Sequence, residues 1–542
     1  MSTTPAPASS ALAAESAART PSGGALAAES AEGVAARAAA VAPALAAIAP
    51  AQLAGGLRAA AGALRADADR LVAIAAEETG LAPAPRLRGE LERTAVQLEM
   101  FSAVALAGSH LDVRVDEADP AFRPLPRPDL RRVLVPLGPV LVFAASNFPF
   151  AFSVAGGDTA AALAAGCPVV VKAHPGHPRL SVAVAEVVRS ALAGAGLPAD
   201  ALQLAGTDPA TGQQDGVDLL RDERIAAASF TGSQRAGRHL ADVAASRRRP
   251  IPFYGELGST NPVVVTAGAL EQAGAEAFAA AYATSATASA GQLCTQPGFV
   301  FVPEGSLAGP LGEALVAAFS GVPEHRLLHP GIAAGYAARR SAVLGAPGVE
   351  VLVEGALREE GDDDGGAPTA VLATPTLVRT TLAALLAAGP ELREEAFGPL
   401  SVIVEHPGLA EVAAAVPDLY EGELTAAVHV TEAEAGTAAD GALSALVSAL
   451  SSVAGRVIFN AWPTGVAVTH AMQHGGPYPA TTDAGRTTSV GSAAVGRFLR
   501  PVTFQGATGA LAALLPAALR DDDPWGVPRA VSAAGESAGW GG

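Results

Sequence analysis

The chain has 542 residues, which exceeds the size of one compact hydrophobic core, so we expect two or more domains. The formal net charge of −18 leaves no basic surface that could replace phosphate counterions, which excludes broad nucleic-acid binding. Two cysteines are too few for a disulfide framework and indicate a reducing compartment. The amino terminus lacks the pattern of a signal peptide, and Gly, Pro or Asn interrupts each long apolar run, so we expect a cytoplasmic protein without a membrane span.

The pattern of the chain changes several times along its length. Residues 1–35 are rich in Ala, Ser, Pro and Gly and predict a disordered leader. A helical pattern follows, in which Gly80 is the expected C-cap of one helix. Between residues 139 and 265, short apolar strands alternate with helices, which is typical of βαβ units and a parallel sheet. A second alternation follows, and residues 511–542 carry little pattern and are interpreted as a C-terminal tail.

An asparagine follows the first strand of this regular region. In AASNFPFAF, the strand ends at Asn147, and Pro149 then forces an extended or turning backbone. The carboxyl ends of parallel strands face the crevice where open α/β sheets bind ligands. The Asn147 amide there can donate a hydrogen bond to an oxyanion. The alternative is an Asx turn before the proline.

A glutamate occupies a similar position later in the region. In YGELGSTNPVVV, Glu256 lies between Gly255 and Gly258, next to an apolar strand. A partly buried carboxylate at this place would have a raised pKa, which suits a general base near neutral pH. The alternative is a solvated turn glutamate.

The two cysteines lie in different sequence contexts. Cys294, in ASAGQLCTQPGFVFV, follows a helix of small residues and precedes a strand, on a loop that can present its thiol to a cleft. A thiol at such a place acts as a nucleophile when its pKa is depressed or a base lies nearby. The alternative is a buried structural thiol. We assign that structural role to Cys167, which lies between a helix and a buried strand.

A phosphate-binding turn is the interpretation of SFTGSQRAGRHLA. A strand leads into Gly232 and Ser233, and a helix follows. The start of a helix offers free N–H groups and the positive end of its dipole to a phosphate. The alternative is an ordinary βα turn in which Ser233 is the N-cap.

Taken together, five motifs resemble one family. The motifs NFP, FTGS, ELG, GQLC and EEAFGP occur in the order and rough spacing of the aldehyde dehydrogenase superfamily, and the resemblance runs from about residue 35 to about residue 505. It implies an α/β fold with a Rossmann-type cofactor domain, an α/β catalytic domain and a small bridging β element. We place these at residues 36–257, 258–470 and 471–510, with residues 111–133 contributing to the bridging element. In this family that element joins subunits, so we expect a homodimer or homotetramer.

The resemblance also implies roles for the catalytic candidates. Cys294 matches the nucleophile, whose thiolate attacks an aldehyde to form a thiohemiacetal and then a thioester. Asn147 and the backbone N–H of Cys294 match the groups that hold the oxyanion. Glu256 matches the general base that activates the hydrolytic water.

Cofactor contacts follow from the same resemblance. Ser233, preceded by Gly232, matches the residue near the pyrophosphate. Glu395 of EEAFGP matches the ligand of the nicotinamide ribose hydroxyls, with Phe397 beside the ring. Lys172, the only lysine of the chain, matches the lysine that contacts the adenosine ribose.

The preferred cofactor is expected to be NADP, with NAD accepted. Members that prefer NAD commonly have a glutamate three residues after this lysine, and that carboxylate would repel a 2′-phosphate. This chain has Pro175 there, with His174 next to it.

The expected substrate comes from segments that depart from the commonest members of the family. Ser146 replaces a frequent tryptophan, and HGGPYPATTD is a distinctive later segment. Both resemble the 2,5-dioxopentanoate (α-ketoglutarate semialdehyde) dehydrogenases, which form 2-oxoglutarate. The residues Trp462, Pro463 and Thr464 are expected to line the substrate entrance.

Other functions remain open at this point. The nearest alternative is an NADP-dependent dehydrogenase of fatty or other aliphatic aldehydes, and a more remote one is a catalytically silent cofactor-binding protein on the same fold. The ten histidines show no metal-ligand spacing beyond HPGHP, so we expect no metal site.

Overall fold

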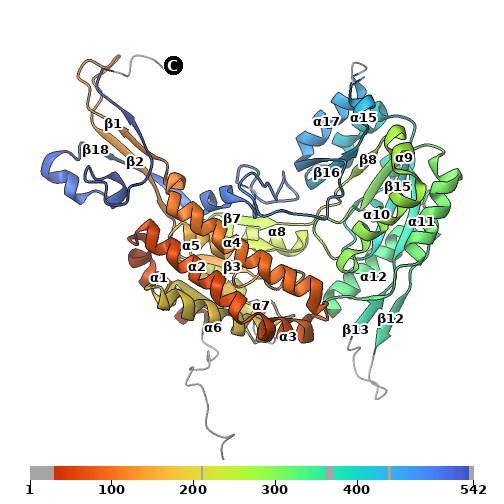
Figure 1. Ribbon diagram of the computed structural model, residues 1–542, viewed down its shortest axis with the longest axis horizontal. Coiled ribbons are helices and arrows are strands. Elements are labelled where there is room, and N and C mark those ends of the chain that lie inside the picture. The colour runs from red at the N-terminus through yellow and green to blue at the C-terminus, as the bar shows by residue number, and fades with distance from the viewer. Residues whose placement is uncertain (1–29, 209–211, 361–369, 437–440, 487, 536–542) are drawn as a thin grey trace, which may run out of the picture.

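The computed structural model describes residues 30–208, 212–360, 370–436, 441–486 and 488–535. Two α/β domains lie side by side, and a small sheet that includes β1, β2 and β18 projects beyond the first domain (Figure 1). None of the helices in these ranges is long and apolar enough to cross a membrane.

The first domain is built on five parallel strands in the order β5-β4-β3-β6-β7. Their bounds are β3 (Val140–Phe143), β4 (Val169–Lys172), β5 (Leu202–Ala205), β6 (Ala227–Thr231) and β7 (Phe253–Glu256). The chain adds β4 and β5 on one side of β3 and then returns to its other side as β6. The carboxyl ends of β3 and β6 therefore form the switch point at which doubly wound sheets bind ligands.

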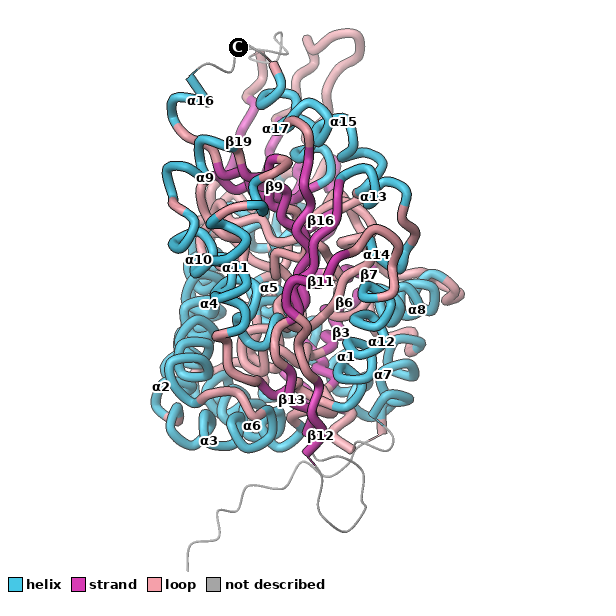
Figure 2. Tube along the Cα trace, turned by 90° about the vertical axis from the view of Figure 1, so that its right-hand side faces the viewer, coloured by secondary structure: helices cyan, strands magenta, loops and turns pink. Residues whose placement is uncertain are grey.

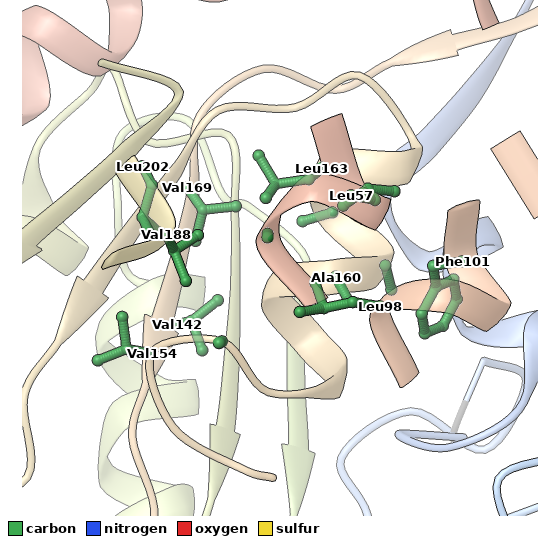
Figure 3. Close-up of a cluster of buried hydrophobic side chains, with 14 of the residues drawn as sticks. Leu57, Leu98, Phe101, Val142, Val154, Ala160, Leu163, Val169, Val188 and Leu202 are labelled. Carbon is green, nitrogen blue, oxygen red and sulfur yellow. The ribbon is translucent and has the colours of Figure 1, made fainter. Parts of the chain in front are cut away.

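Helices cover both faces of this sheet. Their bounds are α1 (Ala31–Ala46), α2 (Pro50–Ala66), α3 (Ala68–Thr79), α4 (Arg88–Ala107), α5 (Gly157–Ala164), α6 (Pro178–Gly194), α7 (Gly212–Arg221) and α8 (Gln234–Ala245). Alternate strand residues enter two different cores, because successive side chains of a strand point to opposite faces. One core joins the sheet to α2, α4, α5 and α6 (Figure 3), and the other joins it to α1, α7 and α8.

The predicted end of the disordered leader at residue 35 is wrong. Helix α1 begins at Ala31, where the Ser30 side chain caps it by accepting a hydrogen bond from Gly33 N–H. Val34 and Ala35 are fully buried in the core beneath the sheet. The alanine-rich composition that suggested low complexity is also a strong helix former, and here it has a core to pack against. The rest of the predicted leader, residues 1–29, lies outside the described residues.

The second domain contains a seven-stranded sheet in the order β11-β14-β15-β9-β8-β16-β17, in which β11 alone is antiparallel to its neighbour. Its strands are β8 (Val263–Val265), β9 (Phe299–Pro303), β11 (Glu350–Val353), β14 (Thr376–Thr381), β15 (Leu400–His406), β16 (Glu423–His429) and β17 (Ala454–Phe459). A separate three-stranded sheet consists of β10 (His325–Arg326), β12 (Leu357–Glu360) and β13 (Ala370–Ala373).

Helices again lie on both sides of the large sheet (Figure 2). Their bounds are α9 (Ala267–Ala273), α10 (Ala275–Thr287), α11 (Pro310–Ser320), α12 (Pro330–Leu344), α13 (Leu382–Ala387), α14 (Pro390–Arg393), α15 (Leu409–Leu419), α16 (Glu432–Gly436) and α17 (Ala442–Val453). One core contains residues of α10 and α11, and the opposite core contains residues of α12, α13, α15 and α17. The predicted α/β class is therefore confirmed for both domains.

The projecting sheet joins segments from distant parts of the chain. Its order is β18-β2-β1-β19, with bounds β1 (Val113–Asp116), β2 (Leu130–Pro136), β18 (Leu499–Gln505) and β19 (Arg529–Ser532). The interpretation of residues 511–542 as a simple tail needs correction, because β19 pairs with β1 and Leu519 is fully buried in the small core under the sheet. The last residues, 536–542, lie outside the described part.

The segment after β17 returns to the first domain. There Phe498 is fully buried in the core of α2, α4 and α5. Arg497 forms a buried ion pair with Asp158 in the first turn of α5. The core of the first domain is therefore completed by residues that lie more than 300 positions later in the chain.

This ion pair predicts a large effect of Asp158→Ala on stability. The change leaves the Arg497 guanidinium buried without its carboxylate, so we expect the free energy of unfolding to fall by about 3 kcal/mol. Urea denaturation followed by circular dichroism measures it. The control is Asp69→Ala, which removes an exposed pair with Arg88 and should cost less than about 0.5 kcal/mol. Equal effects of the two variants would contradict the prediction.

Candidate active site

Most of the residues singled out by the sequence lie at one edge of the five-stranded sheet. Lys172 is the last residue of β4 and Glu256 is the last residue of β7. Asn147 follows β3, and Gly232 and Ser233 follow β6. Since all five strands are parallel, these positions are all at the carboxyl edge, on both sides of the switch point.

Glu256 is buried and held from two directions. Its Oε1 atom lies 3.1 Å from Nε2 of His474, and its Oε2 atom accepts a hydrogen bond from the Ser489 hydroxyl. Burial by itself raises the pKa of this carboxyl, but the contacts with His474 and Ser489 outweigh it, and the net pKa lies below its usual range. The predicted raised pKa is therefore wrong, and so is the alternative of a solvated turn, because the side chain is only 3 % exposed.

Cys294 is half-buried opposite this carboxylate. Its Sγ atom lies 3.4 Å from Nε2 of His474. Burial, followed by the charges of Glu256 and Glu395, raises the pKa of the thiol well above its ordinary value, and Arg93 opposes this rise. The resting thiol is therefore protonated, and its proton has an acceptor within reach at His474.

His474 connects the nucleophile and the carboxylate. It is 1 % exposed, and the edge of its ring meets Phe152 with the ring centroids 6.1 Å apart. Its Nε2 atom faces both Cys294 and Glu256. In the tautomer that carries its hydrogen on Nδ1, the imidazole can take the thiol proton at Nε2 and then donate it in a hydrogen bond to the carboxylate. One ligand atom of each of the three residues lies within 4.8 Å of the others, a donor set that also suits a soft divalent metal. The sequence prediction of no metal site did not anticipate this cluster.

Sequence reasoning missed His474 and Ser489 as site residues. His474 is the first residue of HGGPYPATTD, which was noticed as a distinctive segment but not assigned a contact. The segment reaches the site because Leu257 N–H donates to the carbonyl of Ala480, next to the end of β7. A lone histidine in a Gly- and Pro-rich segment gives no signal of this pairing, which spans 180 residues.

Asn147 lies against the loop that carries the cysteine. Its Nδ2 atom donates a hydrogen bond of 2.9 Å to the carbonyl of Gln292, two residues before Cys294. Its own carbonyl accepts a hydrogen bond of 2.8 Å from Arg86. An asparagine amide has two N–H bonds, so this arrangement leaves the second one for a group bound beside the thiol.

Gly232 and Ser233 are exposed at the start of α8. The Ser233 hydroxyl accepts a hydrogen bond from Ala236 N–H, so its predicted role as N-cap is confirmed. The exposed first turn of α8 still presents backbone N–H groups at the carboxyl edge of the sheet, which is the chemistry that binds a phosphate. The two interpretations of FTGS are thus compatible.

Lys172 occupies a narrow slot beside His174. A Cβ atom built on Gly206 would lie 3.2 Å from Cε of the lysine, and one on Gly216 would lie 3.3 Å from its Cγ. Burial lowers the pKa of Lys172, and the charge of Asp215 opposes this effect.

His174, which the sequence suggested as a cofactor contact, packs against two other histidine side chains. Its ring stacks on His177 with centroids 5.5 Å apart, and it lies equally close to His329 of the second domain. Burial, followed by these neighbours and Lys172, holds the pKa of His174 well below its usual range. The ring is therefore neutral and does not supply a positive charge.

Glu395 and Phe397 approach the site from the second domain. A Cβ atom built on Gly258 would lie 2.4 Å from Oε2 of Glu395, so this carboxyl sits directly over the loop after Glu256. Burial raises the pKa of Glu395 to about 8. Next to Phe397, the carbonyl of Gly398 packs so closely against Gly291 that no side chain fits there, which brings EEAFGP beside the cysteine loop.

These features define a class of enzyme. An exposed helix start and a buried lysine lie along one edge of the sheet, and the Glu395 carboxyl lies over the loop at Gly258. Together they fit an extended dinucleotide. A thiol with a base within reach lies at the end of that line, which is the chemistry of acyl transfer through cysteine.

Comparison with known proteins agrees with this class. The family model for the aldehyde dehydrogenase family matches residues 10–477. The chain is 41 % identical over 459 residues to alpha-ketoglutaric semialdehyde dehydrogenase 2 of Azospirillum brasilense, covering 85 % of this chain and 83 % of that protein. It is 38 % identical over 464 residues to alpha-ketoglutaric semialdehyde dehydrogenase of Acinetobacter baylyi, with the same coverage of both.

Solved structures share the fold. A 3,6-anhydro-L-galactose dehydrogenase in complex with NAP has a TM-score of 0.70 at 23 % identity and covers 88 % of this chain and 91 % of its own. An NAD-dependent aldehyde dehydrogenase from Sinorhizobium meliloti has a TM-score of 0.68 at 23 % identity, with 89 % and 88 % covered. The chain belongs to the aldehyde dehydrogenase family and is an NAD(P)-dependent oxidoreductase that acts on an aldehyde group.

The raised pKa of Cys294 predicts how its alkylation depends on pH. Because only the thiolate reacts, the rate of alkylation by iodoacetamide in the cofactor-free enzyme should rise about tenfold per pH unit between about pH 7 and pH 9. Mass spectrometry of the labelled peptide measures the rate. Cys167 is fully buried with a pKa of about 11, so Cys294→Ser should show almost no labelling. A rate that is already flat at neutral pH would contradict the prediction.

Proposed function

We propose that this enzyme oxidises 2,5-dioxopentanoate to 2-oxoglutarate, with NADP preferred and NAD accepted. The observation that carries the proposal is the cluster in which Nε2 of His474 lies 3.4 Å from Sγ of Cys294 and 3.1 Å from Oε1 of Glu256. The names of the two relatives from Azospirillum brasilense and Acinetobacter baylyi support the choice of substrate.

Acylation begins at Cys294. His474 takes the Sγ proton at Nε2, and the ionised Glu256 stabilises the imidazolium that forms. The thiolate then attacks the aldehyde carbon to form a thiohemiacetal. The Nδ2–H group of Asn147 and the backbone N–H of Cys294 hold the resulting oxyanion. A bound nicotinamide cofactor would supply the acceptor for the hydride that the aldehyde carbon loses, which leaves a thioester on Cys294.

Deacylation uses the same carboxylate. Once the imidazolium has released its proton to solvent, Glu256 takes a proton from a water molecule, and the hydroxide attacks the thioester carbon. The carbon–sulfur bond breaks, the thiolate leaves and the carboxylate product forms. The Ser489 hydroxyl holds Oε2 of Glu256, which orients Oε1 toward the reacting centre.

Other residues of the chain would hold the cofactor. The backbone N–H groups at the start of α8, just after Gly232 and Ser233, would hold the pyrophosphate, and Glu395 would accept hydrogen bonds from the nicotinamide ribose. Phe397 would flank the nicotinamide ring.

The NADP preference is supported by charge. Lys172 supplies an ammonium group at the expected adenosine ribose, and the exposed Pro175 replaces an acidic residue that would repel a 2′-phosphate. The neutral His174 leaves Lys172 as the cation in this place.

We also propose that the projecting sheet joins subunits into a dimer or tetramer. Its edge strand β19 carries Val531, the loop between β1 and β2 carries Leu125, and the short 3-10 helix Gly509–Leu514 ends in Leu514; all three are exposed apolar side chains. Burial of such side chains against a second copy is the usual way in which projecting elements are stabilised.

Because acylation and deacylation are separate steps, Glu256→Gln is predicted to block the second step while the first still occurs. Because the neutral amide cannot take a proton from water, one equivalent of NADPH should form per active site and steady-state turnover should fall about 1,000-fold. Rapid mixing with 2,5-dioxopentanoate and NADP, followed by NADPH absorbance, measures both phases.

His474→Gln is the matched variant for the first step. It should slow the initial burst about 100-fold, since the thiol loses its proton acceptor. Cys294→Ala should show neither phase. Steady turnover of the Glu256→Gln enzyme at a rate close to that of the wild type would exclude the assigned base.

The slot around Lys172 predicts an effect on cofactor binding. In Lys172→Arg the bulkier guanidinium does not fit beside Gly206 and Gly216 without displacing the ribose, so the KM for NADP should rise about tenfold. The KM for the aldehyde should change less. Initial-rate kinetics with both substrates varied measures this, and Arg179→Lys, at an exposed pair with Glu77, is the control. An unchanged cofactor KM would refute the assignment of Lys172.

A further inference from the structure

Arg93 is a half-buried arginine of α4 that the mechanism above does not use. Its Nε and Nη2 atoms are buried and have no hydrogen-bond partner in the part of the chain that the structure describes. These two atoms form the edge of a guanidinium that binds both oxygens of a carboxylate at once. The chain uses the same edge elsewhere, where Nε and Nη2 of Arg248 donate to the two oxygens of Glu223 at 2.9 Å each.

The guanidinium of Arg93 lies beside the catalytic cluster. Its central carbon is 5.5 Å from the ring centroid of Phe148 and 5.4 Å from that of Phe152. Phe152 in turn meets the ring of His474. The charge of Arg93 is close enough to that of Cys294 to oppose the rise of the thiol pKa. An anion bound to Arg93 would therefore lie next to the reacting centre.

The carboxylate of Glu90, whose charge acts on Arg93, is already occupied. Oε1 of Glu90, one turn before Arg93 on the same helix, accepts hydrogen bonds of 2.8 and 2.9 Å from the N–H groups of Phe150 and Ala151. Its Oε2 atom pairs with Arg86, whose other nitrogens donate to Asn147 and Ser289. All three nitrogens of Arg86 thus have partners within the site, whereas Nε and Nη2 of Arg93 are buried without a hydrogen-bond partner among the described residues. Such donors on a charged group are costly in a folded protein unless a ligand compensates them.

A second arginine near the thiol does not offer the same edge. The charge of Arg456 also reaches Cys294, but its Nη1 atom donates to the carbonyl of Gly465 at 2.7 Å and its Nη2 atom to that of Pro463 at 3.0 Å. These bonds hold the loop that carries Trp462 and Thr464. Arg456 therefore supports this loop, and its Nη2 is not available for bidentate binding.

We propose that Arg93 binds the carboxylate of the aldehyde substrate through Nε and Nη2, beside the rings of Phe148 and Phe152. The aldehyde carbon then reaches Cys294 while the far end of the short dioxo acid is fixed, which selects acidic aldehydes over neutral ones of equal length. This assignment rests on the proposed function for the identity of the substrate. The role of Arg93 as an anchor for any carboxylated aldehyde can be tested independently of that substrate.

The test compares each acidic aldehyde with a neutral one of the same length. The full-length enzyme is assayed by NADPH formation with 2,5-dioxopentanoate against pentanal, and with succinic semialdehyde against butanal. Arg93→Met should lower the ratio of kcat/KM for the acidic to the neutral aldehyde about 30-fold, because a charged bidentate interaction is lost. The ratio cancels any effect of Arg93 on the reactivity of the thiol, which both substrates share. Arg88→Met, on the exposed face of the same helix, should leave the ratio unchanged.

Binding of the product gives a second measurement that needs no acidic substrate. Inhibition of pentanal oxidation by 2-oxoglutarate should weaken about tenfold in Arg93→Lys, since a point charge replaces the planar fork. If Arg93→Met does not fold, as judged by its thermal midpoint, Arg93→Lys carries the test with both aldehyde pairs.

The outcomes separate the anchor from the proposed function. A wild-type enzyme that prefers succinic semialdehyde to butanal but does not oxidise 2,5-dioxopentanoate would refute the proposed substrate, and the loss of that preference in Arg93→Met would still support the anchor. Ratios within about twofold of the wild type in folded Arg93 variants would overturn the anchor. So would a wild-type enzyme without preference for either acidic aldehyde.

Discussion

The contact between His474 and Glu256 is the interaction on which the site depends. A buried carboxylate without partners would take up a proton, and the same group held by an imidazole and a hydroxyl stays ionised. That contact also fixes the face of the imidazole that meets Cys294. The nucleophile, its proton acceptor and the base for hydrolysis are therefore a single electrostatic unit. Burial and the charge of Glu256 raise the pKa of Cys294, while the contacts of Glu256 with His474 and Ser489 outweigh its own burial and lower its pKa.

The charged side chains around this unit act on the thiol pKa in opposite directions. Glu256 and Glu395 both raise the pKa of Cys294, so the free enzyme keeps its thiol protonated. Arg93 works in the opposite direction, and Arg86 is neutralised by Glu90. A substrate carboxylate that neutralised Arg93 would remove a positive charge that lowers the thiol pKa. Proton transfer to His474 therefore becomes more important once the substrate is bound.

Local sequence patterns predicted the fold class and the part of the site that lies at strand ends. Asn147, Glu256 and Ser233 each follow or end a recognisable apolar strand, and parallel strands bring their carboxyl ends to one edge whatever the loops do. His474 and Ser489 could not be placed in this way, because they reach the site through a returning segment without regular structure. The pKa of Glu256 was predicted in the wrong direction for the same reason, since its sign is set by those two partners. Arg93 lies in RGELERTAVQ, a helical pattern in which a charged residue is predicted to face solvent. Only the structure shows that its guanidinium lies over the rings of Phe148 and Phe152.

The returning segment has a consequence for synthesis of the chain. The core of the first domain includes Phe498, and the carboxylate of Glu256 is held by Ser489. Both the core and the active site are therefore incomplete until the ribosome has made the segment that follows the second domain. Cys294 emerges long before His474, its proton acceptor. Until the returning segment docks, the newly made chain has a thiol without its proton acceptor and a first domain with an incomplete core. Chemical reactivity therefore begins only when folding is complete.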